Sequence, residues 1–168
     1  MPFIEVKPII DRTVRSLCIK PYSGHPKGCP NFNKKYDCPP QAFLIENILD
    51  LSKPVFAIYN IFDIATHINN MRFSHPTWSE RQLVCCLYWQ GTARKQLKTE
   101  IDTYFKNLYY LDGSIYDSCI KIIQCPEACG VNVTATMHNI GIELEWPPRI
   151  KAYQIVLAGV PNKGLNIQ

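Results

Sequence analysis

The sequence lacks a long apolar run, and no stretch of it reaches the roughly 18 consecutive apolar residues that a membrane-spanning helix needs. Its opening residues, MPFIEVKPIIDRTVR, carry Glu5 and Asp11 and do not follow the basic, apolar, small-residue order of a signal peptide. We therefore expect a soluble, cytoplasmic protein without a membrane partner.

The motifs of the best-marked enzyme classes are absent too. The chain contains no G-x-G-x-x-G, Walker A, H-E-x-x-H or G-x-S-x-G sequence, so the nucleotide-binding and hydrolase chemistries of those motifs have no support. C-x-x-C is missing as well, which excludes a thioredoxin-like redox motif. Whether the protein is an enzyme stays open at this level.

Charge is sparse and nearly balanced. Charged residues make up 19% of the chain and the net charge is +4, which permits contact with nucleic acid without the dense basic stripe that would indicate it. The hydrophobic content of 46% is ordinary for a globular protein. A chain of 168 residues suits one domain, and we expect a loop region over 1–50 and an α/β core over 51–168.

Proline divides the chain, because seven of the 13 prolines fall within the first 40 residues and none lies between Pro76 and Pro126. The opening region therefore reads as irregular loop. Later, apolar periodicity predicts strands over 54–62, 119–125 and 152–160, helices over 63–75, 79–109 and 130–141, and a short strand or extended stretch over 142–146. This order favours an α/β domain with a small sheet of about three to four strands and packed helices, one of them long.

Several helix boundaries carry recognisable signals. Asp63 is a plausible N-cap, His75-Pro76 a stop, and Thr77 and Ser79 open two overlapping capping-box patterns. Gly141 suits the position after a helix. The long helix is expected to bury one stripe of residues: Leu83, Cys86, Ala93, Leu97, Ile101, Tyr104 and Leu108.

Eight cysteines form three groups along the chain. In a reducing cytosol, clustered cysteines bind metal or do chemistry more often than they form disulfides. Three of the eight precede proline directly, as do cysteines that end ferredoxin-type ligand runs. A site with four thiolate ligands is therefore expected, with three from the N-terminal loop and one from the end of a strand: Cys18, Cys29, Cys38 and Cys125.

Other assignments of these residues remain open. His25 stands four residues before Cys29 and could replace one thiolate in a zinc site. Cys119 and Cys129 are further candidate ligands or a redox pair. Adjacent cysteines on a helix point about 100° apart, so Cys85 and Cys86 cannot easily share a metal, and free cysteine is often a small buried hydrophobe.

Three segments resemble an uncharacterised family of predicted metal-binding proteins of bacteria, archaea and phages: PYSGHPKGCPNFNKKYDCPP, HPTWSERQLVCCLYWQGTARKQL and CPEACGVNVTATMHNIGIELEWPP. The resemblance implies a metal or iron–sulfur site on Cys29, Cys38 and Cys125, with Cys18 opening the same loop. Many relatives have an additional cysteine-rich stretch before the late segment, and this chain lacks it. The resemblance names no substrate.

The leading functional hypothesis is one iron–sulfur cluster of the 4Fe-4S type, with a redox or sulfur or small-molecule role and an electron-transfer or protein partner. If the site is catalytic, Glu127, Glu143 and His25 are the candidate proton-transfer groups. The alternative is a structural zinc module that binds a protein or nucleic acid. Stacking and phosphate contacts would then come from residues of one loop: Phe32, Lys34, Lys35 and Tyr36. A third interpretation has no metal and thiols that belong to the core.

Overall fold

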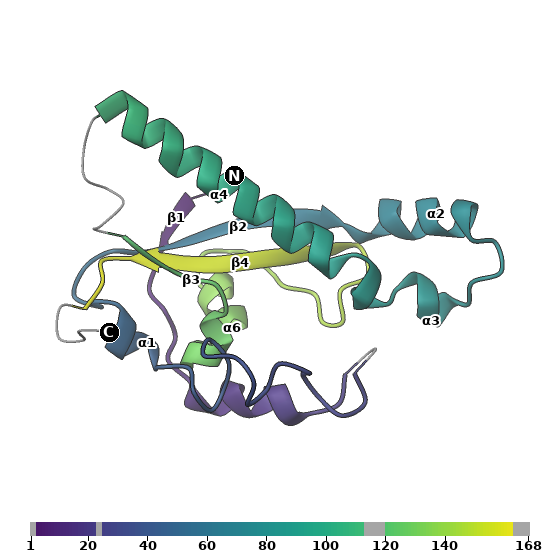
Figure 1. The fold of residues 1–168 in the computed structure, drawn as a ribbon, viewed down its shortest axis with the longest axis horizontal. Coiled ribbons are helices and arrows are strands. Elements are labelled where there is room, and N and C mark those ends of the chain that lie inside the picture. Colours follow the sequence, from purple (N-terminus) through teal and green to yellow (C-terminus); the bar gives the residue numbers. More distant parts are fainter. Residues whose placement is uncertain (1–2, 23–24, 113–119, 163–168) are drawn as a thin grey trace.

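The computed structural model describes residues 3–22, 25–112 and 120–162, and the side chains within those ranges except for residues 105–112. Its centre is a four-stranded antiparallel sheet in the order β1-β2-β4-β3 (Figure 1). The strands are β1 (Phe3–Val6), β2 (Val55–Asp63), β3 (Lys121–Ile123) and β4 (Lys151–Gly159). The predicted α/β class with a small sheet is confirmed, and β1 is a strand that the proline-rich opening concealed.

The strands β2 and β4 form a long ribbon at the middle of the sheet. They pair along their whole length, from Val55 opposite Gly159 to Asp63 opposite Lys151. Their neighbours are shorter: β1 covers β2 only as far as Ile58, and β3 covers β4 only from Leu157 onward. One half of the ribbon therefore has no described strand on either side.

Helices and 3-10 turns cover both faces of the sheet. They are η1 (Arg12–Ile19), α1 (Ile45–Ile48), α2 (Ile64–Ser74), α3 (Glu80–Leu83), η2 (Cys86–Tyr88), α4 (Gln90–Asp112), η3 (Pro126–Cys129) and α6 (Val133–His138). The long helix α4 crosses one face, while α6, α1 and the N-terminal segment lie on the other (Figure 1).

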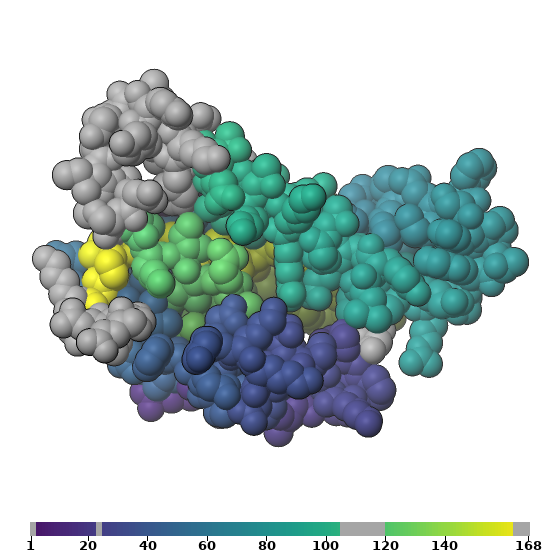
Figure 2. Space-filling view, in the orientation of Figure 1, coloured from purple at the N-terminus to yellow at the C-terminus, as the bar shows by residue number. Residues whose placement is uncertain are grey.

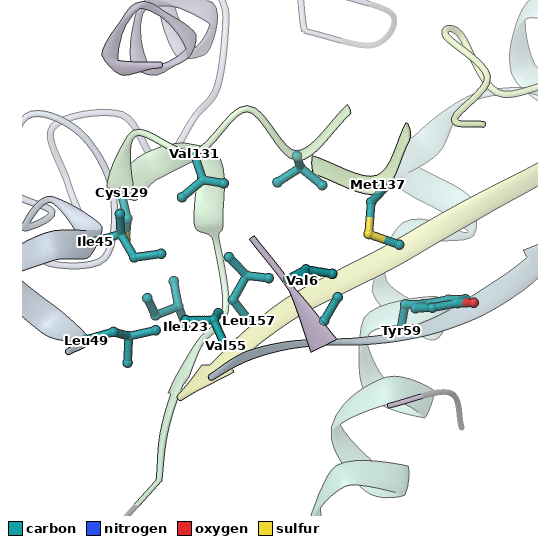
Figure 3. Close-up of a cluster of buried hydrophobic side chains, with 12 residues drawn as sticks. Val6, Ile45, Leu49, Val55, Tyr59, Ile123, Cys129, Val131, Met137 and Leu157 are labelled. Atoms are coloured by element: carbon teal, nitrogen blue, oxygen red, sulfur yellow. The ribbon is translucent and has the colours of Figure 1, made fainter. Parts of the chain in front are cut away.

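Each face of the ribbon buries its own apolar cluster, as expected when alternate strand residues point to opposite sides. On the α4 side, Leu97 and Ile101 pack with Ile58, Val156 and Ala158. The larger cluster lies on the other side and includes Ile45, Leu49, Cys129, Val131, Met137 and Leu157 (Figure 3). The described members of the predicted helical stripe are buried, except for the half-buried Cys86 and the exposed Tyr104.

The long helix expected over 79–109 is broken into α3, η2 and α4. The break follows Leu83, and Cys85 adopts an extended backbone before the chain turns again. It brings Trp89 onto Phe62, with ring centroids 5.5 Å apart, so the indole is buried against the end of β2. Burying this large aromatic side chain offsets the loss of helical hydrogen bonds.

Two of the predicted helix starts are confirmed, whereas the helix expected over 130–141 is shorter, since α6 covers only Val133–His138. Asp63 caps α2 by accepting from the Thr66 N–H, and Ser79 and Gln82 form the S-x-x-Q capping box. Gly141 has a positive φ just past α6. The stretch 142–146 is not a strand. No helix among the described residues is long and apolar enough to cross a membrane.

Candidate metal centre

The backbone brings Cys18 and Cys29 together at the start of the loop. The Cys29 N–H donates to the Cys18 carbonyl oxygen over 2.7 Å. This approach depends on Gly28, which has a φ of +80°, and a Cβ there would lie 2.7 Å from the same carbonyl oxygen. Only glycine fits such a close crossing of two backbone segments.

Cys38 sits in a second compact turn, which Arg15 of η1 holds in place. The Asn33 N–H donates to the Pro39 carbonyl oxygen at 2.8 Å, and the Ala42 N–H donates to that of Cys38 at 2.9 Å. The Arg15 guanidinium donates to the carbonyl oxygens of Pro40 and Ala42, at 3.0 and 2.8 Å. These bonds fasten the turn to the segment that carries Cys18.

Cys125 enters the same region from the sheet. It follows β3 by two residues and is the N-cap of η3, whose first residue is Pro126 and whose C-cap, Gly130, is left-handed. The Asp11 N–H donates to the Gly130 carbonyl oxygen at 2.9 Å, which ties η3 to the start of η1. The prediction that Cys125 lies at the carboxyl end of a strand is confirmed.

The electrostatics show that these thiols share one neighbourhood. Burial raises the pKa of Cys18, and Cys29 and Cys38 raise it further. Burial also raises the pKa of Cys38, with a smaller contribution from Asp37 and then Cys29. A thiolate acts on the pKa of another group only when the two are close. The three loop cysteines therefore lie within electrostatic reach of one another.

Cys125 and Cys129 join this neighbourhood from η3. Burial raises the pKa of Cys125 to about 11, against the opposing effect of Arg94, and Cys38 adds a smaller increase. Burial likewise raises the pKa of Cys129 to about 11, with Cys125 the next cause. Since a nucleophilic cysteine needs a lowered pKa, neither thiol is set up for nucleophilic catalysis at neutral pH.

The thiols lie near one another, but the described residues do not form a complete set of metal ligands. In the described part of the chain, no group of three or more His, Cys, Asp or Glu side chains is arranged to hold a metal ion. None of the seven described cysteines forms a disulfide: Cys18, Cys29, Cys38, Cys85, Cys86, Cys125 and Cys129. The candidate ligand Cys119 lies outside the described residues.

A cavity of about 330 Å³ adjoins two of the predicted ligands, Cys38 and Cys125. Its walls also carry Arg94 from α4 and Glu127 from η3. Burial raises the pKa of Glu127, and the Arg94 guanidinium opposes the rise. Nothing in the pattern of the ARKQLK run, residues 93–98, distinguishes Arg94 from its exposed neighbours, so the sequence alone does not single it out.

The other residues predicted to have a role, His25, Glu143 and Cys86, lie in three different surroundings. His25 pairs with Tyr22 in a short bridge, their rings 4.7 Å apart, and Tyr22 lies near Cys29 and Cys86. Glu143 is exposed beside His138, with 3.1 Å between Oε1 and Nε2, and does not line the cavity. Cys86 packs against the cluster around Trp89, which supports its assignment to the core.

The loop proposed to contact nucleic acid is only partly accessible. Phe32 is half-buried, whereas Lys34, Lys35 and Tyr36 are exposed, and Tyr36 keeps 93% of its surface in solvent. Lys35 also lines the cavity. The aromatic residue that could stack on a base is therefore Tyr36.

Comparison with known proteins finds no matching family model, no matching curated protein and no matching solved structure.

Proposed function

We propose that the protein is a metal-binding protein whose single site takes its ligands from Cys18, Cys29, Cys38 and Cys125. The observation that carries the proposal is the shared neighbourhood of these thiols, since the thiolates of Cys29 and Cys38 raise the pKa of Cys18 and that of Cys38 raises the pKa of Cys125. A cation among them would remove this repulsion.

An iron–sulfur cluster of the 4Fe-4S type is the first choice of cofactor. An all-thiolate donor set is the soft set that iron–sulfur clusters and zinc prefer. Proline directly follows Cys29, Cys38 and Cys125, as it follows the last cysteine of ferredoxin-type ligand runs.

The site's surroundings favour a role in redox or small-molecule chemistry. Cys38 and Cys125 open onto the cavity, so a molecule bound there would reach the metal centre. Glu127 faces the same space, and its raised pKa suits a group that gives or takes a proton. A cytoplasmic location is part of the proposal, and the absence of disulfides among the described cysteines agrees with it.

The second candidate is a structural zinc site that fastens the loop for binding. Tyr36 and Lys34 favour it, because their exposed side chains could stack on a base and contact phosphate, or could meet a protein partner. A zinc site would be colourless, and its removal would unfold the loop because metal binding is coupled to folding.

Anaerobic purification followed by an absorption spectrum and iron, sulfide and zinc analysis tests both candidates. We expect absorption near about 400 nm with bound iron and sulfide. Cys38→Ser and Cys125→Ser should lose the metal, whereas Cys85→Ser should keep it, since Cys85 is not among the described groups that shift the pKa values of Cys18, Cys38 and Cys125. One zinc without colour would select the second candidate, and absence of all three elements would refute the metal site.

Proton release gives an independent measurement. Because burial raises the pKa of Cys125 to about 11, its thiol is protonated at neutral pH and must lose that proton to bind a metal. We therefore expect metal loading to release protons and to strengthen as the pH rises from 6 to about 8. Loading without proton release would exclude thiolate ligation.

A further inference from the structure

The cavity lies along an edge of β4 that pairs with no strand in the described part of the chain. Six consecutive residues of β4, from Lys151 to Val156, line it. The edge strand β3 pairs with β4 only over Leu157–Gly159 and then departs through Gln124 and Cys125, which line one end of the cavity. The open space therefore occupies the position where a longer β3 would have continued.

The backbone groups at this edge can be identified from the alternation of a strand. In an antiparallel sheet, the N–H and C=O of one residue point to the same edge, and the next residue points to the other. Just before β4, the Ile150 carbonyl oxygen accepts from the Ile64 N–H at 3.0 Å on the β2 side, so the even-numbered residues of β4 face β2. Odd-numbered residues therefore face the open edge. Among the described residues, no strand pairs with the backbone groups of Tyr153 and Ile155 there, and the Tyr153 carbonyl oxygen accepts a 3.4 Å bond from the Gln154 side chain.

The open space lies in the plane of the sheet, between its two layers. Leu97 forms one wall and belongs to the cluster on the α4 face. Val133 and Leu144 form the other wall and pack on the opposite face. Figure 2 shows yellow atoms of β4 at the back of a hollow, with teal α4 above and the blue N-terminal loop below. We call this space the β4 slot.

The charges around the β4 slot favour an anionic occupant. Lys35, Arg94 and Lys151 line it and are exposed. Three carboxylates also line it, Asp37, Glu127 and Glu145, and Glu145 already accepts from the N–H groups of Arg149 and Ile150. The basic side chains therefore outnumber the two remaining carboxylates.

We propose that the β4 slot binds a short extended peptide segment carrying an acidic side chain, which adds to the sheet beside β4. Main-chain hydrogen bonds to Tyr153 and Ile155 would supply affinity, as in other cases of strand addition, and the acidic group would meet Arg94. The volume of about 330 Å³ is at the lower end of small-ligand pockets, so only a few residues fit inside. The proposal does not depend on the metal.

A pool of acetylated, amidated pentapeptides tests this proposal, with alternating valine and threonine flanking a central glutamate. Added to ¹⁵N-labelled protein, the pool should shift the Tyr153 and Ile155 amide signals and slow their exchange. Lysine-centred peptides should bind at least about tenfold more weakly. Absence of shifts at millimolar peptide, or shifts confined to another surface, would overturn the proposal.

Two refinements separate strand addition from side-chain binding. N-methylation along the peptide should abolish binding at every second position only, because alternate amides face β4. Equal tolerance at all positions would refute strand addition. Arg94→Gln should weaken the glutamate peptide about tenfold and leave the glutamine-centred peptide unchanged, while Lys98→Gln on the same helix should alter neither. A uniform loss for both peptides would contradict the role of Arg94.

Discussion

The sheet half of the molecule and its cysteine-bearing loop half are built in different ways. In β4 alone, five of nine residues are buried: Ala152, Val156, Leu157, Ala158 and Gly159. Among the described residues from 7 to 44, the buried ones are Val14, Gly28, Pro39 and Ala42. The ribbon is held by apolar burial and a continuous ladder, and the loop half by turns and individual hydrogen bonds.

This difference separates the part of the fold that provides most of the stability from the part that carries the candidate metal ligands. Hydrophobic burial scales with apolar area, so the ribbon has a large, non-directional source of free energy. The loop half has little of it and depends on a few specific contacts, such as those of Gly28 and Arg15. A cysteine-bound metal would add to those contacts where they are fewest.

The largest expected effect comes from breaking the sheet half. Ile58→Ala removes a fully buried side chain that packs with α4, and should lower the free energy of unfolding by about 2–5 kcal/mol. Urea unfolding followed by circular dichroism would measure it. Ile61→Ala in the same strand is the control, because Ile61 is 49% exposed and should cost far less. Equal losses would show that the ribbon's core does not dominate stability.

The next effect should be confined to the loop half. Gly28→Ala forces a Cβ against the Cys18 carbonyl at a positive φ, at a cost of about 1–3 kcal/mol. Hydrogen exchange should rise around Cys29 and stay unchanged in β2 and β4. Gly91→Ala is the matched control, since nothing lies within 4 Å of its Cβ position, and it should be neutral or stabilising. Equal exchange in both variants would contradict the close crossing at Gly28.

Local signals made much of the sheet half predictable. Asp63, Ser79 and Gln82 cap helices through contacts only three residues apart, so the sequence carries the whole interaction. The break after Leu83 was not predictable, because it depends on Trp89 packing against Phe62, far away in the sequence. The strand β1 also escaped prediction, since its pairing partner begins at Val55.

The candidate site also has a part that the sequence predicts and a part that it does not. Residue type and the Cys-Pro pattern selected Cys18, Cys29, Cys38 and Cys125, and whether they bind a metal stays a prediction. The β4 slot could not be foreseen, because it exists only where β3 stops short of β4 and α4 passes overhead. An unpaired edge is a property of tertiary pairing and leaves no mark on β4 itself.

A smaller effect should come from the junction between the two halves. The buried Thr136 hydroxyl of α6 accepts from the Ile9 N–H at 2.9 Å and donates to the Asn132 carbonyl oxygen. Thr136→Val leaves that N–H without its partner and should cost about 1–2 kcal/mol in urea unfolding. Thr134→Val on the same helix is the control, because Thr134 is exposed and its hydroxyl accepts from the indole N–H of Trp146, which is exposed as well. A loss no larger than that of Thr134→Val would show that the hydrogen bond between Ile9 and Thr136 does not stabilise the fold.

The smallest effect is the response to acid, which should differ between the halves. Hydrogen bonds from Thr66 lower the pKa of Asp63 below 3.8, so its stabilising contribution is complete above that value and is lost as the pH falls through the lowered pKa. In the loop half, Thr13 lowers the pKa of Asp11 in the same way. Glu127 acts in the opposite sense, because burial raises its pKa above 4.5 and protonation relieves a penalty as the pH falls through that raised value.

Acidification from pH 6 to about pH 4 should therefore favour the loop half around η3 before the caps of either half begin to fail. Residue-resolved hydrogen exchange over this range would measure it, and Glu127→Gln should abolish the gain while Glu143→Gln keeps it. A uniform decline at both η3 and α2 would mean that Glu127 is solvated, and that the two halves do not differ in how they carry charge.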